Sequence, residues 1–402
     1  MRVSPARTPH TSTPRSPVTP TTLTVPKPRV SARTRRAPAG DGPATVATEV
    51  GGLLDFAGRN AVIRSRGYLP GPKDVAVPAA LVARYGLRRG DLVRGAGENG
   101  RLASVVSLNG APVDTGASRP DFADLVPIHP DERLRLETTP NVLATRVIDL
   151  FAPVGKGQRG LIVAPPKAGK TMFLKAVANA ITANHPECHL MVVLVDERPE
   201  EVTDMRESVR AEVVASTFDR PPLDHILAAE LAVERAKRLV ETGRDVVVLI
   251  DSITRLGRAY NMAAPSGGRV LTGGMDARAL HQPKKVLGAA RNIQDGGSLT
   301  ILATTLVETG SKMDDNLFEE FKSTGNMELK LSRSLADRRV FPAVDVVASG
   351  TRREELLLDA AELPLIWRLR RALQDQESFE RFLGSLKNTG SNAELLLALS
   401  RG

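Results

Sequence analysis

Between residues 50 and about 113, the hydrophobic and polar positions are those of short strands with turns. Short runs with strand character are separated by turn residues, and these runs lie at 52–56, 60–64, 75–77, 91–94 and 102–108. Gly-Pro, Arg-Gly-Asp and Glu-Asn-Gly segments mark the turns, and residues 78–85 fit a short helix. Several short strands bounded by such turns are typical of a small closed barrel, here predicted over residues 45–115.

The pattern changes at residue 151, after a polar connector over 116–150. Continuous apolar strands are expected at 160–164, 190–196, 212–217, 245–251 and 298–305, and amphipathic helices at 170–183, 199–210 and 224–242. The end of the chain, from Arg353, is predicted to be helical. This alternation is typical of a mostly parallel sheet with helices on both faces, so residues 151–402 are predicted to form an α/β domain. The five short strands before it, within about sixty residues, favour a small Greek-key barrel of the OB type.

Residues 1–44 contain Pro, Thr, Ser and Arg and almost no large apolar side chain. Such a segment buries too little surface to offset its ordering entropy, so it is predicted to be disordered. The formal net charge of the whole chain is +9, and the first forty residues carry eight Arg and Lys and no acid. The remainder is therefore nearly neutral. The tail is either a basic arm that adds affinity for RNA or a solvated segment without a specific role.

Composition excludes several classes of protein. The single cysteine, Cys188, rules out an intramolecular disulfide framework and any multi-cysteine zinc or iron–sulfur site, and it fits a reducing cytoplasm. The longest apolar runs are far shorter than the roughly 18–20 residues that a membrane span requires. The first forty residues contain no apolar segment typical of a secretory signal. A cytoplasmic protein that does not enter a membrane is expected.

The clearest motif is Ala164-Pro165-Pro166-Lys167-Ala168-Gly169-Lys170-Thr171, which follows an apolar strand and opens a helix. This is the context that a P-loop requires, in which backbone N–H groups surround phosphate oxygens. Lys170 is expected to reach the β- and γ-phosphates of ATP, and the Thr171 hydroxyl is expected to bind Mg²⁺. Ala164 stands where the first glycine of the motif is usual.

Two further strands end in acidic residues that suit the same chemistry. Asp251 ends the apolar strand 245–251 and is expected to hold Mg²⁺ directly or through water. Glu197 and Arg198 follow the strand 191–195. If that strand lies next to the P-loop strand, Glu197 is placed to polarise the attacking water, and Arg198 to contact the nucleotide or a neighbouring subunit.

These residues resemble those of bacterial transcription termination factor Rho, a hexameric RecA-type RNA helicase and translocase. The resemblance covers roughly residues 50–400. Its most specific segments are Gly155–Gly160, Ala164–Thr171, Asp196–Val202, Asp251–Arg255, Val270–Gly274, Glu308–Met313, Gly325–Leu329 and Ser349–Arg352. It implies a RecA-like P-loop core, a homohexameric ring, and ATP and Mg²⁺ as cofactors. It also implies single-stranded RNA as a partner and RNA polymerase as an indirect or transient one.

The resemblance also implies roles for individual residues. Glu197 is the expected catalytic glutamate, Arg198 a nucleotide contact, and Phe341 the residue that packs on adenine. Arg352 is the expected arginine finger toward the ATP of the adjacent subunit, with Arg339 as the second candidate. The expected nucleotide-binding stretches are Gly155, Lys156, Gly157, Gln158, Arg159 and Gly160, and Lys167, Ala168, Gly169, Lys170, Thr171 and Met172.

Two loops are implied to contact RNA in the central channel. One spans 264–274 and carries Arg269, and the other contains Gly310, Ser311 and Lys312. Each combines small residues with one cation, which lets the backbone approach a sugar-phosphate chain.

The barrel departs from the family at its RNA-binding strand. Residues 59–64 contain no aromatic side chain, and a second aromatic expected near 100–102 is missing. Only the segment around Tyr68 matches well, and Tyr68 is a predicted RNA contact. Each lost base stack costs about 1–3 kcal/mol. RNA binding by the barrel is therefore expected to rely on Arg59, Arg64, Arg101 and the basic tail. The family's N-terminal helical subdomain is not visible either.

Three functions stay open from the sequence. The first is an ATP-driven RNA translocase that terminates transcription. The second is a RecA-type ring ATPase without RNA translocation, and the third is a divergent, non-terminating RNA-binding paralogue. The OB segment and the two loops favour the first over the second, and the intact P-loop, Glu197, Asp251 and Arg352 argue against loss of the motor.

Overall fold

The computed structural model describes residues 48–65, 67–113, 119–265, 267, 270–271 and 273–401, with only the backbone of Arg278. The tail 1–44 and Arg269 lie outside these described residues. The account below concerns the single unit that begins at Val46.

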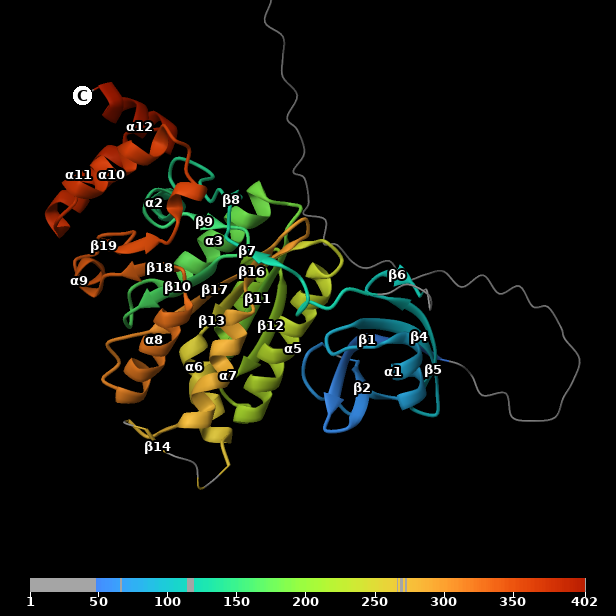
Figure 1. The fold of residues 1–402 in the computed structure, drawn as a ribbon. Coiled ribbons are helices and arrows are strands. Elements are labelled where there is room, and N and C mark those ends of the chain that lie inside the picture. Colours follow the sequence, from blue (N-terminus) through green and yellow to red (C-terminus); the bar gives the residue numbers. More distant parts are fainter. Residues whose placement is uncertain are drawn as a thin grey trace, which may run out of the picture. The chain divides into compact units, whose positions relative to one another are not determined.

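The first domain is a small barrel, drawn in blue and cyan in Figure 1. Its strands follow the order β3-β2-β1-β4-β5-β6, and a further pairing of β3 with β5 closes the sheet. Leu54, Ile63, Val93 and Leu102 fill its interior. The predicted OB-type barrel is confirmed. Its elements are β1 (Thr48–Ala57), β2 (Asn60–Arg64), β3 (Val75–Val77), α1 (Ala79–Tyr85), β4 (Leu92–Glu98), β5 (Arg101–Leu108) and β6 (Ala111–Pro112).

The second domain is built on a sheet with the central order β12-β11-β13-β17-β10-β18-β19. The strands from β12 to β18 are parallel and β19 is antiparallel. The short strands β16 and β7 extend the sheet antiparallel beside β17. The main strands are β10 (Arg159–Ala164), β11 (His189–Glu197), β12 (Glu212–Thr217), β13 (Asp245–Asp251), β17 (Ser298–Leu306), β18 (Met327–Leu331) and β19 (Val344–Thr351), with β7 (Pro127–Ile128) and β16 (Arg291–Ile293).

Helices cover both faces of this sheet, because its central strands are apolar on both sides. One face carries α3 (Lys170–Asn184) and α4 (Pro199–Ser208). The other face carries α5 (Pro222–Val240), α6 (Ile253–Ala263), α7 (Ala277–Gly288) and α8 (Lys312–Thr324). The predicted α/β architecture is confirmed.

The predicted connector contains a helix that belongs to the core. Seven of the nine residues of α2 (Leu143–Phe151) are buried. The guanidinium of Arg146 on α2 donates hydrogen bonds to the carbonyls of Leu386 and Thr389, both at 2.8 Å, and so joins α2 to the helical end of the chain. The remaining elements are β8 (Arg133–Leu134), β9 (Val154–Gly155), β14 (Val270–Leu271), β15 (Met275–Asp276), α9 (Arg333–Asp337), a 3₁₀ turn (Glu354–Leu356), α10 (Glu362–Ala372), α11 (Gln376–Lys387) and α12 (Asn392–Arg401).

The order of the strands corrects one expectation. The strand that carries Glu197, β11, does not lie beside the P-loop strand β10, because β13 and β17 lie between them. Asp251 ends β13, which β17 alone separates from β10.

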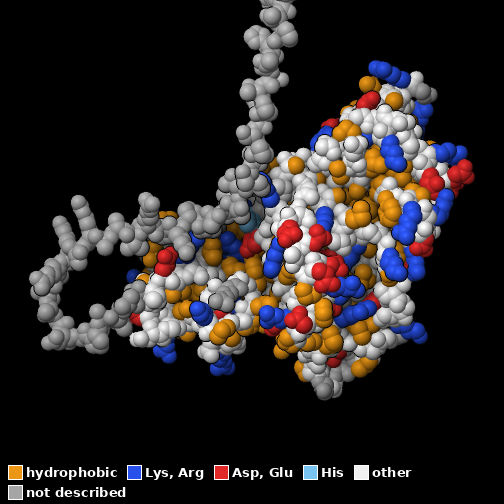
Figure 2. Space-filling model, turned by 180° about the vertical axis from the view of Figure 1, so that it is seen from behind, with side chains coloured by type: hydrophobic (Ala, Val, Ile, Leu, Met, Phe, Trp, Pro, Cys, Tyr) orange, Lys and Arg blue, Asp and Glu red, His pale blue; other side chains and the backbone are white. Residues whose placement is uncertain are grey.

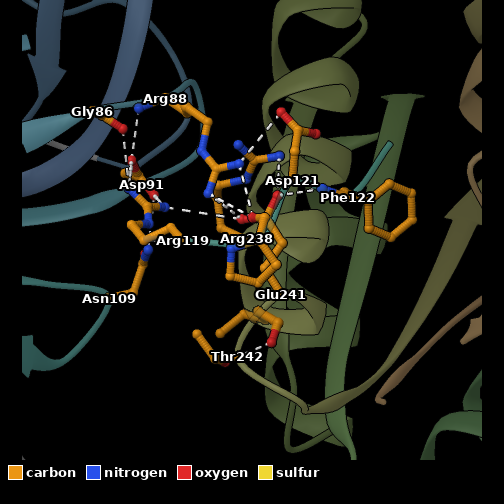
Figure 3. Close-up of polar contacts among 12 residues, drawn as sticks. Gly86, Arg88, Asp91, Asn109, Arg119, Asp121, Phe122, Arg238, Glu241 and Thr242 are labelled. Atoms are coloured by element: carbon orange, nitrogen blue, oxygen red, sulfur yellow. Dashed lines mark hydrogen bonds and ion pairs between the residues drawn. The ribbon is translucent and has the colours of Figure 1, made fainter. Parts of the chain in front are cut away.

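A buried ion-pair network joins the barrel to the α/β domain (Figure 3). Glu241, at the C-terminal end of α5, accepts contacts from Arg88 of the barrel at 2.9 Å and from Arg238 at 2.8 Å. Arg119 bridges to Asp91 of the barrel at 2.5 Å. Burial raises the pKa of Glu241, although Arg238 and Arg88 oppose this rise. The turn at Gly90 lies so close to α5 that an added Cβ would stand 2.4 Å from a backbone carbon of Glu234.

The surface shows no large patch of one charge on the face in Figure 2, where acidic and basic side chains are interspersed. This agrees with a body that is nearly neutral without its tail. Within the described ranges, every helix is too short or too polar to cross a bilayer.

Candidate nucleotide site and RNA-facing loops

The P-loop connects β10 to α3 and has the backbone shape of a phosphate-binding turn. Lys167 has φ +66° and Gly169, directly before the helix, has φ +93°. Glycine adopts the latter conformation without strain, and it leaves the N–H groups of the first turn of α3 unhindered. Ala164 is fully buried at the end of β10. The sequence motif therefore has the expected strand–loop–helix context.

The Lys170 ammonium lies between two buried carboxylates. Its Nζ is 2.8 Å from Oε1 of Glu197 and also contacts Oδ1 of Asp251. Burial disfavours the charge of Lys170, but Asp251 and Glu197 outweigh it, and the pKa of Lys170 is raised. Lys170 is therefore a cation at neutral pH. The structure brings together three residues that are 27 and 54 positions apart in the sequence.

Glu197 is directed into the sheet edge by an irregularity in β11. The pairing of β11 with β12 shifts between Val195 and Glu197, and Asp196 has φ +56°. Arg255 of α6 donates to the carbonyl and carboxylate of Asp196 and has its Nε 3.7 Å from Glu197. Glu197 is only 2% exposed, and burial raises its pKa although Lys170 opposes the rise. A carboxylate with a raised pKa is better suited to accept a proton from water.

The oxygen ligands fit a magnesium ion. Asp251 is 1% exposed, and Thr304 donates a hydrogen bond of 2.8 Å to its Oδ1. Thr171 stands half-buried in the first turn of α3. The described residues contain no group of three or more acidic, His or Cys side chains that would form an all-protein metal cage. One carboxylate and one hydroxyl nevertheless suit Mg²⁺, which usually keeps waters and binds substrate phosphates.

An apolar pocket of about 330 Å³ lies beside the P-loop. Phe341 is 38% exposed there, and an atom of its ring is 3.8 Å from where a Cβ on Gly169 would stand. Met172, on the first turn of α3, also faces this pocket. One wall of the pocket, residues 141–144 at the start of α2, was not predicted, because apolar residues in a polar connector form no motif. The full lining is Asn141, Val142, Leu143, Ala144, Gly169, Met172, Phe173, Ala176, Phe341 and Pro342.

The predicted nucleotide stretch 155–160 lies at the opposite end of β10 from the P-loop of its own chain. It precedes β10 and the P-loop follows it, so the length of the strand, roughly 17 Å, separates them. Each of these side chains has a structural partner instead. Lys156 pairs with Glu132 at 2.6 Å and Asp245 at 2.8 Å. Gln158 donates to Asn326 at 2.7 Å.

The glycines and the arginine of this stretch are also held by their neighbours. A Cβ on Gly157 would stand 2.2 Å from the backbone nitrogen of Asn292, and Arg159 donates to two backbone carbonyls. A Cβ on Gly155 or Gly160 would clash with side chains. Residues 155–160 form the turn that anchors β10 to its neighbours.

Arg352 lies at this same far edge. Thr351, at the end of β19, pairs with Met327 of β18. Met327 in turn pairs with Gly160, at the start of β10 and so at the end of the strand opposite the P-loop. Arg352 is exposed and makes no ion pair with the described residues. Arg339 is also exposed but follows α9, two residues before the pocket residue Phe341. Of the two arginines, Arg352 is therefore the one far from its own P-loop. Arg198 is exposed at the start of α4.

The two predicted RNA loops meet. The position of a Cβ on Gly273 lies 2.9 Å from the carbonyl carbon of Lys312, and Asn261 donates to the Gly274 carbonyl at 3.1 Å. Gly310 and Lys312 are exposed, and Ser311 is the N-cap of α8. In the second loop, Asp314 accepts from Thr309 at 2.6 Å and from Arg258 of α6 at 2.8 Å.

The barrel corrects two predicted RNA contacts. Arg64 is buried and pairs with Asp55 at 2.6 Å and Asp74 at 2.7 Å. Tyr68 is 9% exposed and donates its hydroxyl to Glu212 of β12. Both side chains are thus used inside the protein rather than offered to a base. Arg101 is exposed at the start of β5, with no acidic partner among the residues that the structure describes.

Comparison with known proteins identifies both domains. Residues 50–112 match the model of the Rho termination factor RNA-binding domain, and residues 144–351 match that of the ATP synthase alpha/beta family nucleotide-binding domain. Solved type III secretion ATPases share the fold. One prototypical enzyme has TM-score 0.58 at 21% identity, covering 75% of this chain and 94% of that chain. The assembled ATPase EscN of enteropathogenic E. coli has a TM-score of 0.58 at 18% identity, and the match covers 90% of this chain and 98% of EscN.

Curated relatives named transcription termination factor Rho are much closer in sequence. The relative from Streptosporangium roseum is 65% identical over 352 residues, which are 86% of this chain and 91% of that protein. The relative from Streptomyces lividans is 62% identical over 365 residues, and the one from Micrococcus luteus is 59% identical over 373. Each of these two alignments covers 88% of this chain. The chain spans about half the length of each of these relatives, 52% of the one from Streptomyces lividans and 54% of the one from Micrococcus luteus.

Proposed function

The chain belongs to the transcription termination factor Rho family, and from this we propose that it is an ATP-driven RNA translocase that ends transcription. The observation that carries the proposal is the cluster of Lys170, Glu197 and Asp251, in a chain that also has an OB-type RNA-binding domain.

ATP is placed on the P-loop, with its adenine in the apolar pocket against Phe341 and Met172. The triphosphate draws Lys170 away from its two carboxylates, because a phosphate group carries more negative charge than either. Glu197 is then free to accept a proton from the attacking water, while Arg255 keeps its carboxylate in place. Arg198 and Lys167, both exposed beside the loop, are further nucleotide contacts.

Mg²⁺ would be held by Asp251 and Thr171, where it neutralises developing charge on the phosphates. The chain's own part in this arrangement is orientation. Thr304 holds the Asp251 carboxylate from behind, and the second oxygen of Asp251 makes no hydrogen bond to the described residues.

The arginine finger acts between subunits of a ring. Arg352 stands a full strand length from the P-loop of its own chain, so it serves the ATP of an adjacent subunit. An arginine supplied in this way is worth about 10³–10⁵ in rate. Hydrolysis then depends on assembly of the homohexamer.

RNA is contacted by the paired loops 264–274 and 308–312. Lys312 offers its charge to a phosphate, and the Thr309–Asp314–Arg258 contacts tie this loop to α6. The same helix carries Arg255, which contacts Asp196 and Glu197. A change in the RNA loop therefore has a short, packed route to the ATP site. RNA polymerase is the transient partner, in the cytoplasm.

The test is ATP-dependent release of a DNA oligonucleotide annealed downstream on an RNA strand, followed by release of transcripts from halted RNA polymerase. Release in both assays, absent with Lys170→Ala, supports the proposal. Strand release without transcript release favours the alternative of a non-terminating RNA-binding paralogue, which the aromatic-free strand β2 also favours. ATP hydrolysis without strand release indicates a ring ATPase that does not translocate on RNA.

A further inference from the structure

A single arginine of α10 holds both sides of the turn that carries Arg352. Arg352 lies between the end of β19 and the 3₁₀ turn that begins at Glu354. The guanidinium of Arg370, on α10, donates from Nη1 to the carbonyl of Ser349 at 2.9 Å. Its Nη2 donates to the carboxylate of Glu354 at 3.3 Å. One side chain therefore contacts the residue three positions before Arg352 and the residue two positions after it.

The carboxylate of Glu354 is held at both oxygens by α10. Its Oε2 accepts from Arg370, and its Oε1 accepts from the indole N–H of Trp367 at 2.9 Å. Trp367 and Arg370 are three positions apart, so they lie on one face of the helix. The side chains of Arg370 and Glu354 are 22% and 15% exposed, so their ion pair is partly withdrawn from water. A hydrogen bond between charged groups is stronger there than on an open surface.

Arg370 also ties this turn to the core of the domain. Its Nη2 donates to the carbonyl of Phe151, the last residue of α2, and its Cζ lies 5.5 Å from the centre of the Phe151 ring. The backbone N–H of Arg352 donates to the carbonyl of Asn326 at 2.9 Å. The backbone on which Arg352 stands is thus fixed, whereas its side chain is exposed.

We propose that Arg370 is a positioning residue for ATP hydrolysis, which acts by holding the turn that presents Arg352 to the adjacent subunit. The inference rests on the proposed role of Arg352 as an arginine finger. The reach of a finger across a subunit interface depends on where its backbone stands. A displacement of about 1 Å can cost a hundredfold in rate. Loss of Arg370 should therefore slow hydrolysis without weakening ATP binding by the P-loop of its own chain.

The test is complementation between subunits, because a positioning role and a packing role predict different results for mixed rings. Arg370→Gln removes the charge and the fork of donors. Arg371→Gln is the matched control, because Arg371 is the next residue of α10, is exposed and makes no ion pair within the described part of the chain. RNA-stimulated kcat, KM for ATP and the thermal unfolding midpoint are measured for each variant alone. Each is then mixed with Lys170→Ala subunits and, separately, with Arg352→Ala subunits.

Arg370→Gln alone should have a kcat lower by about ten- to a hundredfold with KM within about threefold, and the Arg371→Gln control should match the parent. Mixing Arg370→Gln with Lys170→Ala should give a rate above the sum of the two separate rates. Some interfaces then join an intact P-loop to an Arg352 that is held correctly. Mixing it with Arg352→Ala should give no more than that sum, because no interface then has a correctly held finger.

An unchanged kcat for Arg370→Gln would overturn the proposal. So would a reduced kcat that Lys170→Ala subunits fail to restore although they restore Arg352→Ala, since the defect then lies in the subunit's own packing. Glu354→Gln, which removes one charge and no bulk, takes the same two mixtures if Arg370→Gln does not fold. If Arg352→Ala keeps the parent kcat or is not restored by mixing, the proposed finger role of Arg352 fails instead.

Discussion

The nucleotide site and the barrel both bury charged side chains, but they leave them in different states. In the nucleotide site, Lys170 contacts the carboxylates of Glu197 and Asp251. The phosphates of ATP would replace these carboxylates as partners of Lys170, and Mg²⁺ would bind Asp251. In the barrel, Arg64 contacts Asp55 and Asp74, and no ligand is required to complete that arrangement. The first set of contacts adjoins the P-loop, and its cation, Lys170, is 16% exposed, whereas Arg64 in the second set is 6% exposed.

The difference shows how to separate functional charges from structural ones. A buried cation between two acids suggests a site only when a phosphate-binding loop and a cavity adjoin it, as at Gly169 and Phe341. A buried arginine whose carboxylate partners lie in the same barrel, such as Arg64, indicates a structural role. By this criterion Arg101 and Arg59, both exposed, stay the predicted RNA contacts of the barrel, whereas Arg64 does not.

The largest effect is expected for Lys170→Ala. The variant loses the phosphate contact and removes the ammonium that Glu197 and Asp251 share, so ATP turnover should fall by at least about a hundredfold. Ring assembly, measured by sedimentation, should persist. Lys175→Ala is the control on the same helix, because Lys175 pairs with Asp204 on the surface. Turnover within tenfold of the parent would remove Lys170 from its role.

The next effect concerns the far edge of the sheet. Arg352→Ala should lose about 10³-fold or more in turnover when it is the only subunit present. Mixing it with Lys170→Ala subunits should restore part of the activity, because some interfaces then join an intact P-loop to an intact Arg352. The steady-state rate of the mixture measures this. No recovery after verified subunit exchange would transfer the finger role to Arg339.

A stability effect is expected in the barrel. Arg64→Ala leaves Asp55 buried without one of its arginines, and such a loss typically costs about 3–5 kcal/mol. Arg89 still contacts Asp55 at 2.9 Å, which favours the lower end of that range. Denaturant unfolding measures the change. If RNA affinity falls while unfolding is unchanged, Arg64 is an RNA contact after all.

A smaller effect is expected from deletion of residues 1–44. Single strands lose affinity with a log–log salt slope of about −0.7 per neutralised phosphate, so removing the basic tail should flatten the slope. Fluorescence anisotropy of a labelled RNA across a salt series measures it. The same slope with and without the tail would mean that its cations do not contact RNA.

The fold and much of the nucleotide site were accessible from the sequence because their signals are local. The P-loop, the strand ends at Glu197 and Asp251, and the alternation of strands and helices each lie within a short window. The contact between Glu197 and Lys170 depends on strand order, which the sequence left open: adjacency of β11 to β10 was only a condition, and the structure places β13 and β17 between them. That Arg64 and Tyr68 have partners in the folded protein depends on tertiary contacts, which composition does not encode.

The same limit applies to the segment 155–160. The resemblance implied nucleotide contacts for this segment, and the structure shows that its glycines Gly157 and Gly160 pack closely against Asn292 and Leu302. The apolar pocket wall before α2 was missed because it carries no motif. Motifs identify which chemistry a chain contains, and packing decides which of the candidate residues are free to perform it.

We expect RNA to drive the ATPase and the barrel to bind that RNA through charge rather than base stacking. The decisive measurement is steady-state ATP hydrolysis with poly(C), poly(U), poly(A) and no RNA. Every polymer should stimulate hydrolysis at least about tenfold at low salt, with C and A within about threefold, because without aromatic stacking the charge contribution is independent of base. Hydrolysis that is unaffected by RNA, or stimulated by poly(C) alone, would contradict it.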